Sequence, residues 1–377
     1  MRILVDYRPA LRERTGVGEF VHELAKALCG PGSSGPPVEV ALFSSSWKDR
    51  PAPGLAAEMP GARIVDSRIP VRALTWLWNR AEWPPVEWLA GAVDVTHSQN
   101  PMLIPSARAA QVVTIHDLDF LRHPEQAEAE MRRDFPRLAR AHAARAHGVV
   151  VSSHYAKGEV TRELGLPAAR VHVCPPGAPA WAPGVAATRT PGRGRHILFM
   201  GTLGPRKNVG TLLEAYARLR ARVPEAPPLV LAGHGTPASA RWEARARQAP
   251  LAGHVEVTGY VTQSRRVALY SEACMLVLPS YEEGFGLPVL EAMACGVPVV
   301  VSSRGSLPEV AGPAADPVHP DDAEGLSARM QALLDPHAAD EAARAGLAQA
   351  SRFSWAACAA AARGAYAAAL EAHAHRG

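Results

Sequence analysis

The chain has 377 residues, which is more than a single hydrophobic core usually organises, and this length predicts two domains. Its formal net charge is +4 with histidine neutral, so the composition excludes the strongly basic surface of a nucleic-acid-binding protein. The five cysteines are dispersed without metal-ligand spacing, no apolar run is long enough to cross a bilayer, and we find no secretion signal. We therefore expect reduced thiols and a cytoplasmic location.

Short runs of Val, Ile and Leu alternate with helical patterns along the chain, which is typical of βα units with parallel sheets. In the first half, we expect strands near residues 2–6, 38–43, 62–66, 93–97, 111–115, 148–152 and 171–174. In the second half, we expect them near residues 196–200, 229–232, 255–258, 275–279 and 297–302. The pattern therefore predicts an α/β protein with two parallel sheets.

The segment from Cys174 to Gly194 is rich in proline and glycine, which favours an interdomain linker over a packed element. We place the domain boundary near residue 188. The predicted domains then span residues 1–188 and 189–353, and the alanine-rich stretch from Ser354 to His373 is a strong helix candidate.

A glycine pair, Gly16 and Gly18, follows the first expected strand and begins a helix that should run to about Cys29. Backbone N–H groups at a helix N-terminus bind phosphate, so this turn is a candidate contact for an anionic ligand. The pair lacks the third glycine and the acidic residue of a dinucleotide-binding fingerprint, which argues against NAD.

Four of the eight tryptophans crowd into one short segment together with four arginines: Trp76, Trp78, Trp83, Trp88, Arg63, Arg68, Arg72 and Arg80. A basic, Trp-rich amphipathic stretch could rest on a membrane surface or bind a lipid-linked acceptor. Ordinary core packing is the alternative, and we favour it.

The strand near residues 111–115 ends in the sequence T-I-H-D-L-D-F, in which His116 and Asp117 are candidate site residues. A helix-capping Asp117 beside a packed histidine is the alternative interpretation. Asp117 and Asp119 also imitate a metal-binding D-x-D motif.

The strand near residues 196–200 leads into the loop G-T-L-G-P-R-K-N, which should deliver Arg206 and Lys207 to the carboxyl edge of a sheet. Adjacent cations there suit a diphosphate leaving group, because they stabilise the negative charge that grows as its bond breaks. A solvated basic turn is the alternative.

The segment E-G-F-G-L-P-V-L-E-A-M-A-C-G places Glu283 before a predicted helix and Glu291 inside it. Gly284 and Gly286 let the backbone approach a ligand closely, and Gly296 should end the helix. Both carboxylates should accept hydrogen bonds from hydroxyls, and a vicinal ribose diol fits one of them. A capped surface helix with two solvated glutamates is the alternative.

Together these stretches resemble the retaining glycosyltransferases of family 4, which have the GT-B fold of two facing Rossmann-like domains. The resemblance extends over nearly the whole chain and implies a nucleotide-sugar donor in the cleft, with the C-terminal helix, residues 354–377, packing back on the first domain. Lys207 matches the family's diphosphate lysine, whereas Thr202, after Gly201, stands where many relatives carry arginine. Arg206 is then expected to supply the second positive charge.

The same resemblance implies the remaining roles. His116 would contact the transferred sugar or act catalytically, and Glu283 would hold sugar hydroxyls while Glu291 binds the nucleoside. Tyr260 would border the nucleobase and Val261 would bond it through its main chain, although an ordinary strand-ending turn explains Tyr260 equally well. The donor diphosphate is expected to contact the amides of Gly284, Phe285, Gly286 and Leu287, with Gly16 and Gly18 on the first domain. Asp117 is the second choice, after His116, for the contact with the transferred sugar.

The predicted activity is retaining transfer of a hexose to a saccharide, a lipid-linked oligosaccharide or a small metabolite. GDP-mannose is the first choice of donor because the P-R-K-N loop resembles that of mannosyltransferases in the family; UDP-glucose or UDP-N-acetylglucosamine is the alternative. Since two cationic side chains already neutralise the diphosphate, we expect no metal and no cofactor. A sugar-nucleotide epimerase and a non-catalytic sugar-nucleotide binder are the alternatives of another class.

Overall fold

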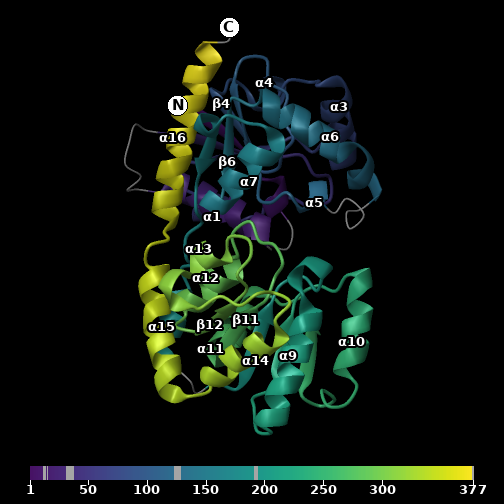
Figure 1. The fold of residues 1–377 in the computed structure, drawn as a ribbon. Coiled ribbons are helices and arrows are strands. Elements are labelled where there is room, and N and C mark those ends of the chain that lie inside the picture. The colour runs from purple at the N-terminus through teal and green to yellow at the C-terminus, as the bar shows by residue number, and fades with distance from the viewer. Residues whose placement is uncertain (12–13, 15, 31–37, 123–128, 191–193, 376–377) are drawn as a thin grey trace. The chain divides into compact units, whose positions relative to one another are not determined.

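The computed structural model describes residues 1–11, 14, 16–30, 38–122, 129–190 and 194–375, with the backbone alone for residues 129–134. They form two compact units (Figure 1). Unit 1 comprises Met1–Gly177 with Ser354–Gly377, and unit 2 comprises Ala178–Phe353. Among the described residues, no helix combines the length and the apolar character that a membrane span requires.

Unit 1 is built on a seven-stranded parallel sheet in the order β3-β2-β1-β4-β5-β6-β7. Its strands are β1 (Arg2–Asp6), β2 (Glu39–Ser44), β3 (Arg63–Asp66), β4 (Val95–Ser98), β5 (Ala110–Thr114), β6 (Gly148–Val151) and β7 (Val171–Val173). The strand order reverses between β1 and β4. In open α/β sheets, ligands bind outside the carboxyl ends of the strands at such a switch point.

The helices of unit 1 cover this sheet. They are α1 (Gly16–Cys29), α2 (Leu55–Glu58), α3 (Val71–Ala81), α4 (Glu87–Ala90), α5 (Asp119–Arg122), α6 (Ala129–Arg145), α7 (His154–Leu164) and α16 (Trp355–Ala374), with short 3-10 turns at Arg8–Ala10 and Ala168–Arg170. The C-terminal helix α16 packs against α1 and the central strands of unit 1 (Figure 1). Its buried face consists mainly of alanines, whose small side chains let the helix approach closely.

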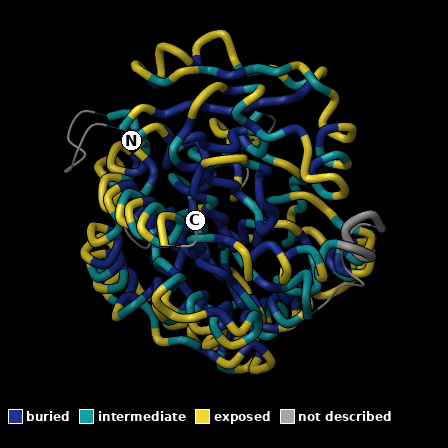
Figure 2. The backbone as a smooth tube through the Cα atoms, turned by 90° about the horizontal axis from the view of Figure 1, so that it is seen from above, coloured by how far each residue is buried: buried dark blue, intermediate teal, exposed yellow. Residues whose placement is uncertain are grey.

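Unit 2 has a five-stranded parallel sheet in the order β10-β9-β8-β11-β12. Its strands are β8 (His196–Met200), β9 (Leu229–Ala232), β10 (Val255–Gly259), β11 (Ala273–Leu278) and β12 (Val299–Val301). Every residue of β8 and β11 is buried, as expected for central strands covered on both faces. Figure 2 shows the buried stretches of the backbone in dark blue. The strand order reverses between β8 and β11.

The helices of unit 2 are α8 (Ala182–Thr188), α9 (Val209–Arg222), α10 (Ala240–Ala246), α11 (Gln263–Glu272), α12 (Leu287–Ala294), α13 (Leu307–Ala311), α14 (Ala323–Ala332) and α15 (Pro336–Ala350). Short 3-10 turns lie at Pro205–Lys207, Pro237–Ser239 and Gly312–Ala314. The predicted α/β class with two parallel sheets is confirmed, and all twelve strands lie at or within two residues of their predicted positions.

The predicted linker differs from the structure. The units divide after Gly177, whereas the predicted boundary near residue 188 falls at the end of α8. Ala182 and Val185 of this helix are buried in the core of unit 2, so most of the segment is packed structure. Proline in the first turn of a helix costs no hydrogen bond, which explains why a proline-rich segment still forms α8.

Candidate functional site

The carboxyl edge of the unit 2 sheet collects charged side chains from two loops. Arg206 and Lys207 follow β8, and Glu283 follows β11. Because β8 and β11 are the neighbouring strands at which the order reverses, the loops that leave them meet at the switch point.

These three residues contact one another directly, and we call them, with Ser280, the cation–carboxylate cluster. Lys207 Nζ donates to Glu283 Oε1 at 2.5 Å, and Arg206 Nη1 lies 3.3 Å from Glu283 Oε2. Ser280 Oγ also donates to Glu283 Oε1, at 2.7 Å. The side chains of Lys207 and Arg206 are only 12% and 23% exposed, which excludes a solvated basic turn.

The charge of Glu283 follows from these contacts. Burial by itself would raise the pKa of this carboxyl group, but the charges of Lys207 and Arg206 and the hydrogen bonds from Lys207 and Ser280 outweigh it. The pKa of Glu283 is therefore lowered, and the cluster holds one carboxylate between two cations at neutral pH.

The loop that carries Glu283 is held by the residues after β12. Ser306 donates to the Glu283 carbonyl through its backbone N–H at 3.1 Å and through its hydroxyl at 3.0 Å. Gly305 has a φ of +65°, and a Cβ there would lie 2.6 Å from the backbone nitrogen of Glu283. Neither residue was predicted from the sequence, because nothing local to them indicates a contact with a loop more than twenty residues earlier.

The loop that carries Lys207 is shaped by glycine. Gly201 has a φ of +148°, and a Cβ at this position would lie 3.4 Å from Cε of Lys207. Its backbone N–H donates to Ala232 at the end of β9. Thr202 is exposed, and no cation stands at its position, so Arg206 is the second cation of the cluster.

The bend before α12 is buried from Gly284 to Gly286, while Leu287 is half-buried. Gly286 is the residue that precedes the helix, with a φ of +92° that favours glycine. Phe285 packs edge-on against Phe353, with ring centroids 5.6 Å apart. The bend therefore belongs to the packed part of unit 2.

Glu291 lies inside α12 and is only 5% exposed. Its Oε1 lies 3.5 Å from Nη1 of Arg266 on α11. Since Glu283 is also only 5% exposed, the alternative of a surface helix with two solvated glutamates is wrong. The two carboxylates differ in partners, because Glu283 meets the cations after β8 and Glu291 meets Arg266.

Two further loops begin at the same edge of the unit 2 sheet, after β9 and β10. Tyr260, after β10, is 36% exposed and stacks on His234, which follows β9, with ring centroids 4.8 Å apart. Val261 is half-buried against the core of unit 2. His234 was not among the predicted residues, although the glycines on both sides of it mark a loop of the same kind as Gly201–Asn208.

In unit 1, His116 follows β5 and packs edge-on against Phe20, with ring centroids 5.2 Å apart. Its Nε2 is buried without a hydrogen-bond partner in the part of the chain that the structure describes. Burial lowers the pKa of His116 to about 4, against a smaller opposing effect of Asp117, so the ring is neutral at neutral pH.

The other predicted residues of unit 1 have local roles. Asp117 Oδ1 accepts a hydrogen bond from the backbone of Asp119 at the start of α5, as the capping alternative expects. A Cβ on Gly18 would lie 2.8 Å from the carbonyl oxygen of Pro9, so this glycine is required for packing, whereas a Cβ on Gly16 would meet nothing. Among the described residues, no three His, Cys, Asp or Glu side chains form a group that could hold a metal ion.

The tryptophan segment departs from the favoured interpretation. Only Trp78 is buried, at 3% exposure, and it stacks on Phe43. Trp76, Trp83 and Trp88 are 62%, 51% and 70% exposed. Core packing is therefore wrong for three of the four side chains. Trp76 lies on α3, whose buried residues are Leu74 and Trp78, whereas Trp83 follows this helix and Trp88 lies in α4.

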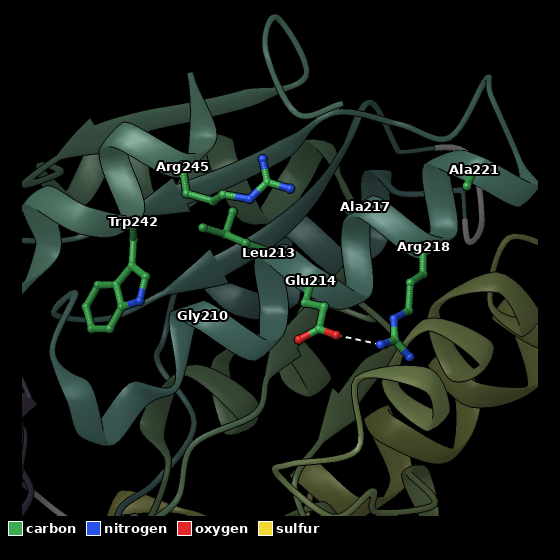
Figure 3. Close-up of a pocket in the computed structure, with 8 residues that line it drawn as sticks. All are labelled: Gly210, Leu213, Glu214, Ala217, Arg218, Ala221, Trp242 and Arg245. Atoms are coloured by element: carbon green, nitrogen blue, oxygen red, sulfur yellow. Dashed lines mark hydrogen bonds and ion pairs between the residues drawn. The ribbon is translucent and has the colours of Figure 1, made fainter. Parts of the chain in front are cut away.

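A cavity of about 570 Å³ lies between α9 and α10 of unit 2 (Figure 3). Its lining consists of Gly210, Leu213, Glu214, Ala217, Arg218, Ala221, Trp242 and Arg245. Glu214 and Arg218 form an ion pair at 2.5 Å along one side. None of the predicted site residues lines this cavity.

The chain matches two family models of glycosyltransferases. The family model described as Glycosyl transferases group 1 matches residues 186–349, and the model described as Glycosyltransferase Family 4 matches residues 14–181. The chain is 33% identical over 274 residues to the O-antigen chain mannosyltransferase B of Escherichia coli, a match that covers 70% of this chain and 71% of that protein.

Two solved structures share the fold of the chain. Sucrose-phosphate synthase from Thermosynechococcus elongatus matches with a TM-score of 0.72 at 22% identity, over 95% of this chain and 96% of that one. Anabaena Alr3699/HepE in complex with UDP and glucose matches with a TM-score of 0.65 at 18% identity, over 95% of this chain and 96% of that one.

Proposed function

We propose that this chain, which belongs to the group 1 glycosyltransferases of the GT-B fold, transfers mannose from GDP-mannose to a saccharide acceptor with retention of configuration. The observation that carries the proposal is the cation–carboxylate cluster at the β8/β11 switch point, where two partly buried cations are fixed around Glu283. The choice of mannose is supported by the likeness to a protein named as a mannosyltransferase.

The cluster suits a diphosphate leaving group. In the proposed reaction, the bond between the anomeric carbon and the phosphate oxygen breaks, and its electron pair stays on the phosphate. Lys207 and Arg206 stabilise that charge without reorganisation, because Glu283, which also accepts a hydrogen bond from Ser280, already holds the lysine and arginine side chains in place. This arrangement supports transfer without a metal ion.

The acceptor step needs no protein nucleophile. The acceptor hydroxyl oxygen bonds to the anomeric carbon on the face that the diphosphate leaves, and its proton passes to the departing phosphate oxygen. Glu283 and the neutral ring of His116 accept hydrogen bonds from hydroxyls of the transferred sugar. Glu291 binds the ribose diol, and the stacked pair of His234 and Tyr260 borders the nucleobase.

The donor is tested by melting the protein in the presence of GDP-mannose, UDP-glucose, UDP-N-acetylglucosamine and an ADP-sugar. A ligand that binds only the native state raises the melting temperature, so GDP-mannose should give the largest shift. A larger shift with UDP-glucose would indicate that the transferred sugar is glucose and not mannose. This alternative is supported by the fold-level likeness to a protein solved with UDP and glucose. No shift with any of the four would contradict the function.

Product analysis then separates transfer from the other classes. With donor and a mannose-terminated oligosaccharide, transfer gives a longer oligosaccharide and free GDP. An epimerase would alter the donor when no acceptor is present, and a non-catalytic binder would leave both compounds unchanged.

The exposed tryptophans favour a membrane-bound acceptor. Trp76, Trp83 and Trp88, here called the tryptophan surface, lie on α3, after it and on α4, and the rings of Trp83 and Trp88 meet at 5.9 Å. Tryptophan is enriched where proteins meet the headgroup region of a bilayer, because its ring is apolar and its N–H is polar. A surface with three such rings would hold the enzyme where lipid-linked saccharides are exposed.

The charges of this segment complement anionic lipid. Arg72 and Arg80 stand four residues before and after Trp76, on the exposed side of α3. The nearby carboxylates are engaged: Glu82 is held in an ion pair, and Glu87 accepts hydrogen bonds from backbone N–H groups. Flotation with vesicles that contain phosphatidylglycerol should recover the wild type, and should recover much less of a Trp76→Ala/Trp88→Ala variant.

Trp47→Ala is the matched control, because Trp47 is 73% exposed and lies outside this segment. The buried Trp78 is unsuitable for the test, because its replacement would open the core around Phe43. Equal recovery of wild type and double variant, or no flotation of the wild type, would contradict the membrane proposal while leaving the glycosyltransferase proposal intact.

A further inference from the structure

Asn208 directly follows Lys207 and precedes helix α9. Its φ is +55°, in the left-handed region that asparagine enters more readily than most residues other than glycine. An asparagine just before a helix usually caps it through its side chain, but Asn208 makes no such hydrogen bond. Because the residue is only 5% exposed, its side-chain amide must find its partners elsewhere.

The amide of Asn208 bridges three segments of unit 2. Its Nδ2 donates to the Pro279 carbonyl at 3.1 Å and to the Pro320 carbonyl at 2.7 Å. Its Oδ1 accepts from Thr211 Oγ1 at 2.7 Å. Carbonyls only accept, so the two that face Nδ2 use both hydrogens of the amide. A carboxylate of the same shape could not make these bonds.

The two carbonyls belong to different loops. Pro279 follows β11, in the loop that carries Glu283, and Pro320 lies shortly before helix α14. Asn208 itself ends the loop after β8 that carries Lys207. It therefore joins the loop of the two cations to the loop of the carboxylate, 71 positions away, by a buried contact.

A second pair of contacts closes the same junction. The backbone N–H of Tyr281 donates to the Arg206 carbonyl at 2.9 Å, and the Tyr281 hydroxyl donates to Asp321 Oδ1 at 2.7 Å. Tyr281 is 42% exposed, so water can replace the bond of its hydroxyl. Loss of the Asn208 amide would instead leave two buried carbonyls without this donor. The junction therefore depends more on Asn208 than on the Tyr281 side chain.

The lysine beside Asn208 needs such support. A lysine ammonium ends a flexible four-carbon stem, so its place depends on how firmly the backbone below it is held. Lys207 donates to Glu283 Oε1, which belongs to the other loop that Asn208 ties down. Lysine is also rare in this chain, which contains only Lys26, Lys48, Lys157 and Lys207. Because Lys207 is the only lysine between residues 178 and 353, its ammonium can be followed separately.

We propose that Asn208 is a positioning residue that clamps the loop of Lys207 to the loop of Glu283, so that the ammonium meets the departing phosphate in the transfer step. Lys207 touches the leaving group, and Asn208 acts only through it. The inference rests on the proposed function for the chemistry at the ammonium, whereas the clamp is a property of the protein alone.

The kinetic test uses the full chain and Asn208→Gly, which removes the side chain while the backbone can keep its φ of +55° without strain. We expect the turnover number to fall by about 10²-fold, the cost of misplacing a reacting group by about 1 Å. The KM for donor should change much less, because the lysine acts mainly in the transition state. Asn208→Asp keeps the shape of the side chain but cannot donate, so it should also lose turnover.

Acylation of lysines with acetic anhydride, followed by mass spectrometry, tests the clamp without the reaction. In the wild type, Lys207 should react much more slowly than the exposed Lys26 and Lys48, because its side chain is 12% exposed and donates to Glu283. In Asn208→Gly, the rate at Lys207 relative to these two internal standards should rise about 10-fold, the effect of losing roughly one buried hydrogen bond.

Tyr216→Phe is the matched control, because Tyr216 is also buried in unit 2 and donates to a proline carbonyl, that of Pro227, at 2.9 Å. It should lower the melting temperature but leave the labelling of Lys207 and the turnover number unchanged. Wild-type labelling of Lys207 in Asn208→Gly would overturn the proposal, and so would faster labelling with wild-type turnover. A wild type that transfers no sugar would instead reject the proposed function, and the labelling would still decide whether the clamp exists.

Discussion

The carboxyl edges of the two sheets differ in their electrostatics. In unit 2, Lys207 and Arg206 surround the ionised Glu283. In unit 1, His97 is fully buried and His116 is half-buried, and burial keeps both rings neutral. The same parallel topology thus presents fixed charge in one unit and uncharged rings in the other. Fixed charge suits a departing diphosphate, and a neutral imidazole can exchange hydrogen bonds with a sugar hydroxyl.

The largest effect is expected from Lys207→Ala. It removes the cation closest to Glu283 and should lower the turnover number by about 10²–10³-fold, the cost of losing one preorganised donor to a developing negative charge. Steady-state kinetics with the donor identified by melting would measure it. Arg195→Ala is the control, because its side chain is 81% exposed in the same unit, and it should retain full activity. Near-normal turnover in Lys207→Ala would show that the lysine takes no part in the transfer step.

Glu291→Ala should also lower turnover by orders of magnitude, and it should lower the stability of the fold as well. It leaves Arg266, whose side chain is 14% exposed, without the carboxylate that it faces. Breaking such a buried pair costs about 3 kcal/mol of unfolding free energy, measured by urea denaturation. Glu291→Gln should recover part of the stability but not the affinity for donor. Full activity of Glu291→Gln would contradict the ribose role, and Glu341→Ala on the surface of α15 is the control.

Gly305→Ala tests whether the loop behind Glu283 must be rigid. The new Cβ would lie 2.6 Å from the Glu283 backbone nitrogen at a φ of +65°, so we expect a loss of about 1–3 kcal/mol and a lower turnover number. Gly364→Ala in α16, where an added Cβ meets nothing, should be neutral or slightly stabilising. If Gly305→Ala kept both its stability and its activity, the close packing of residue 305 against the Glu283 backbone would not be needed to hold the loop that carries Glu283.

The contributions of the two sheet edges to folding stability should also be lost over different pH ranges. The pKa of His116 falls from 6.5 to about 4 on folding, and that of His97 to about 3, so the unfolded chain takes up more protons below pH 6.5. The stability that both neutral rings contribute is complete above pH 6.5 and is lost as the pH falls toward 4 and below. Denaturation between pH 7.5 and 4.5 should therefore show a smaller slope for His116→Asn than for the wild type.

The stability that the Glu283 carboxylate contributes is lost at a lower pH than the range in which the histidine contribution begins to fall. The folded pKa of Glu283 lies below 4.5, so its contribution is complete above pH 4.5 and is lost only as the pH falls through the folded value. Glu283→Gln should leave the slope between pH 7.5 and 4.5 unchanged. An equal change of slope in both variants would erase the distinction between the two edges.

The smallest effect is expected from removal of divalent metal. Because Lys207 and Arg206 supply the positive charge, excess chelator should leave the rate of transfer unchanged. Loss of activity in chelator, with recovery on addition of magnesium or manganese, would show that the two cations are insufficient.

The sequence alone determined the strands and the loops that leave them, because the central strands are continuous apolar runs and the glycines and charged residues follow them directly. Lys207, Glu283 and His116 could be selected on this basis. The short helix α8 could not be predicted, because a proline in sequence looks the same in a linker and in a first helical turn.

Only the tertiary structure decided which of these residues meet. Lys207 and Glu283 are 76 positions apart, and Asn208 and Pro320 are 112 apart, so no local period relates them. The exposure of Trp76 beside the buried Trp78 likewise depends on which face of α3 meets the sheet. Hydrophobic pattern is a property of neighbours along the chain, whereas ion pairing, hydrogen bonding between loops and exposure depend on neighbours in space.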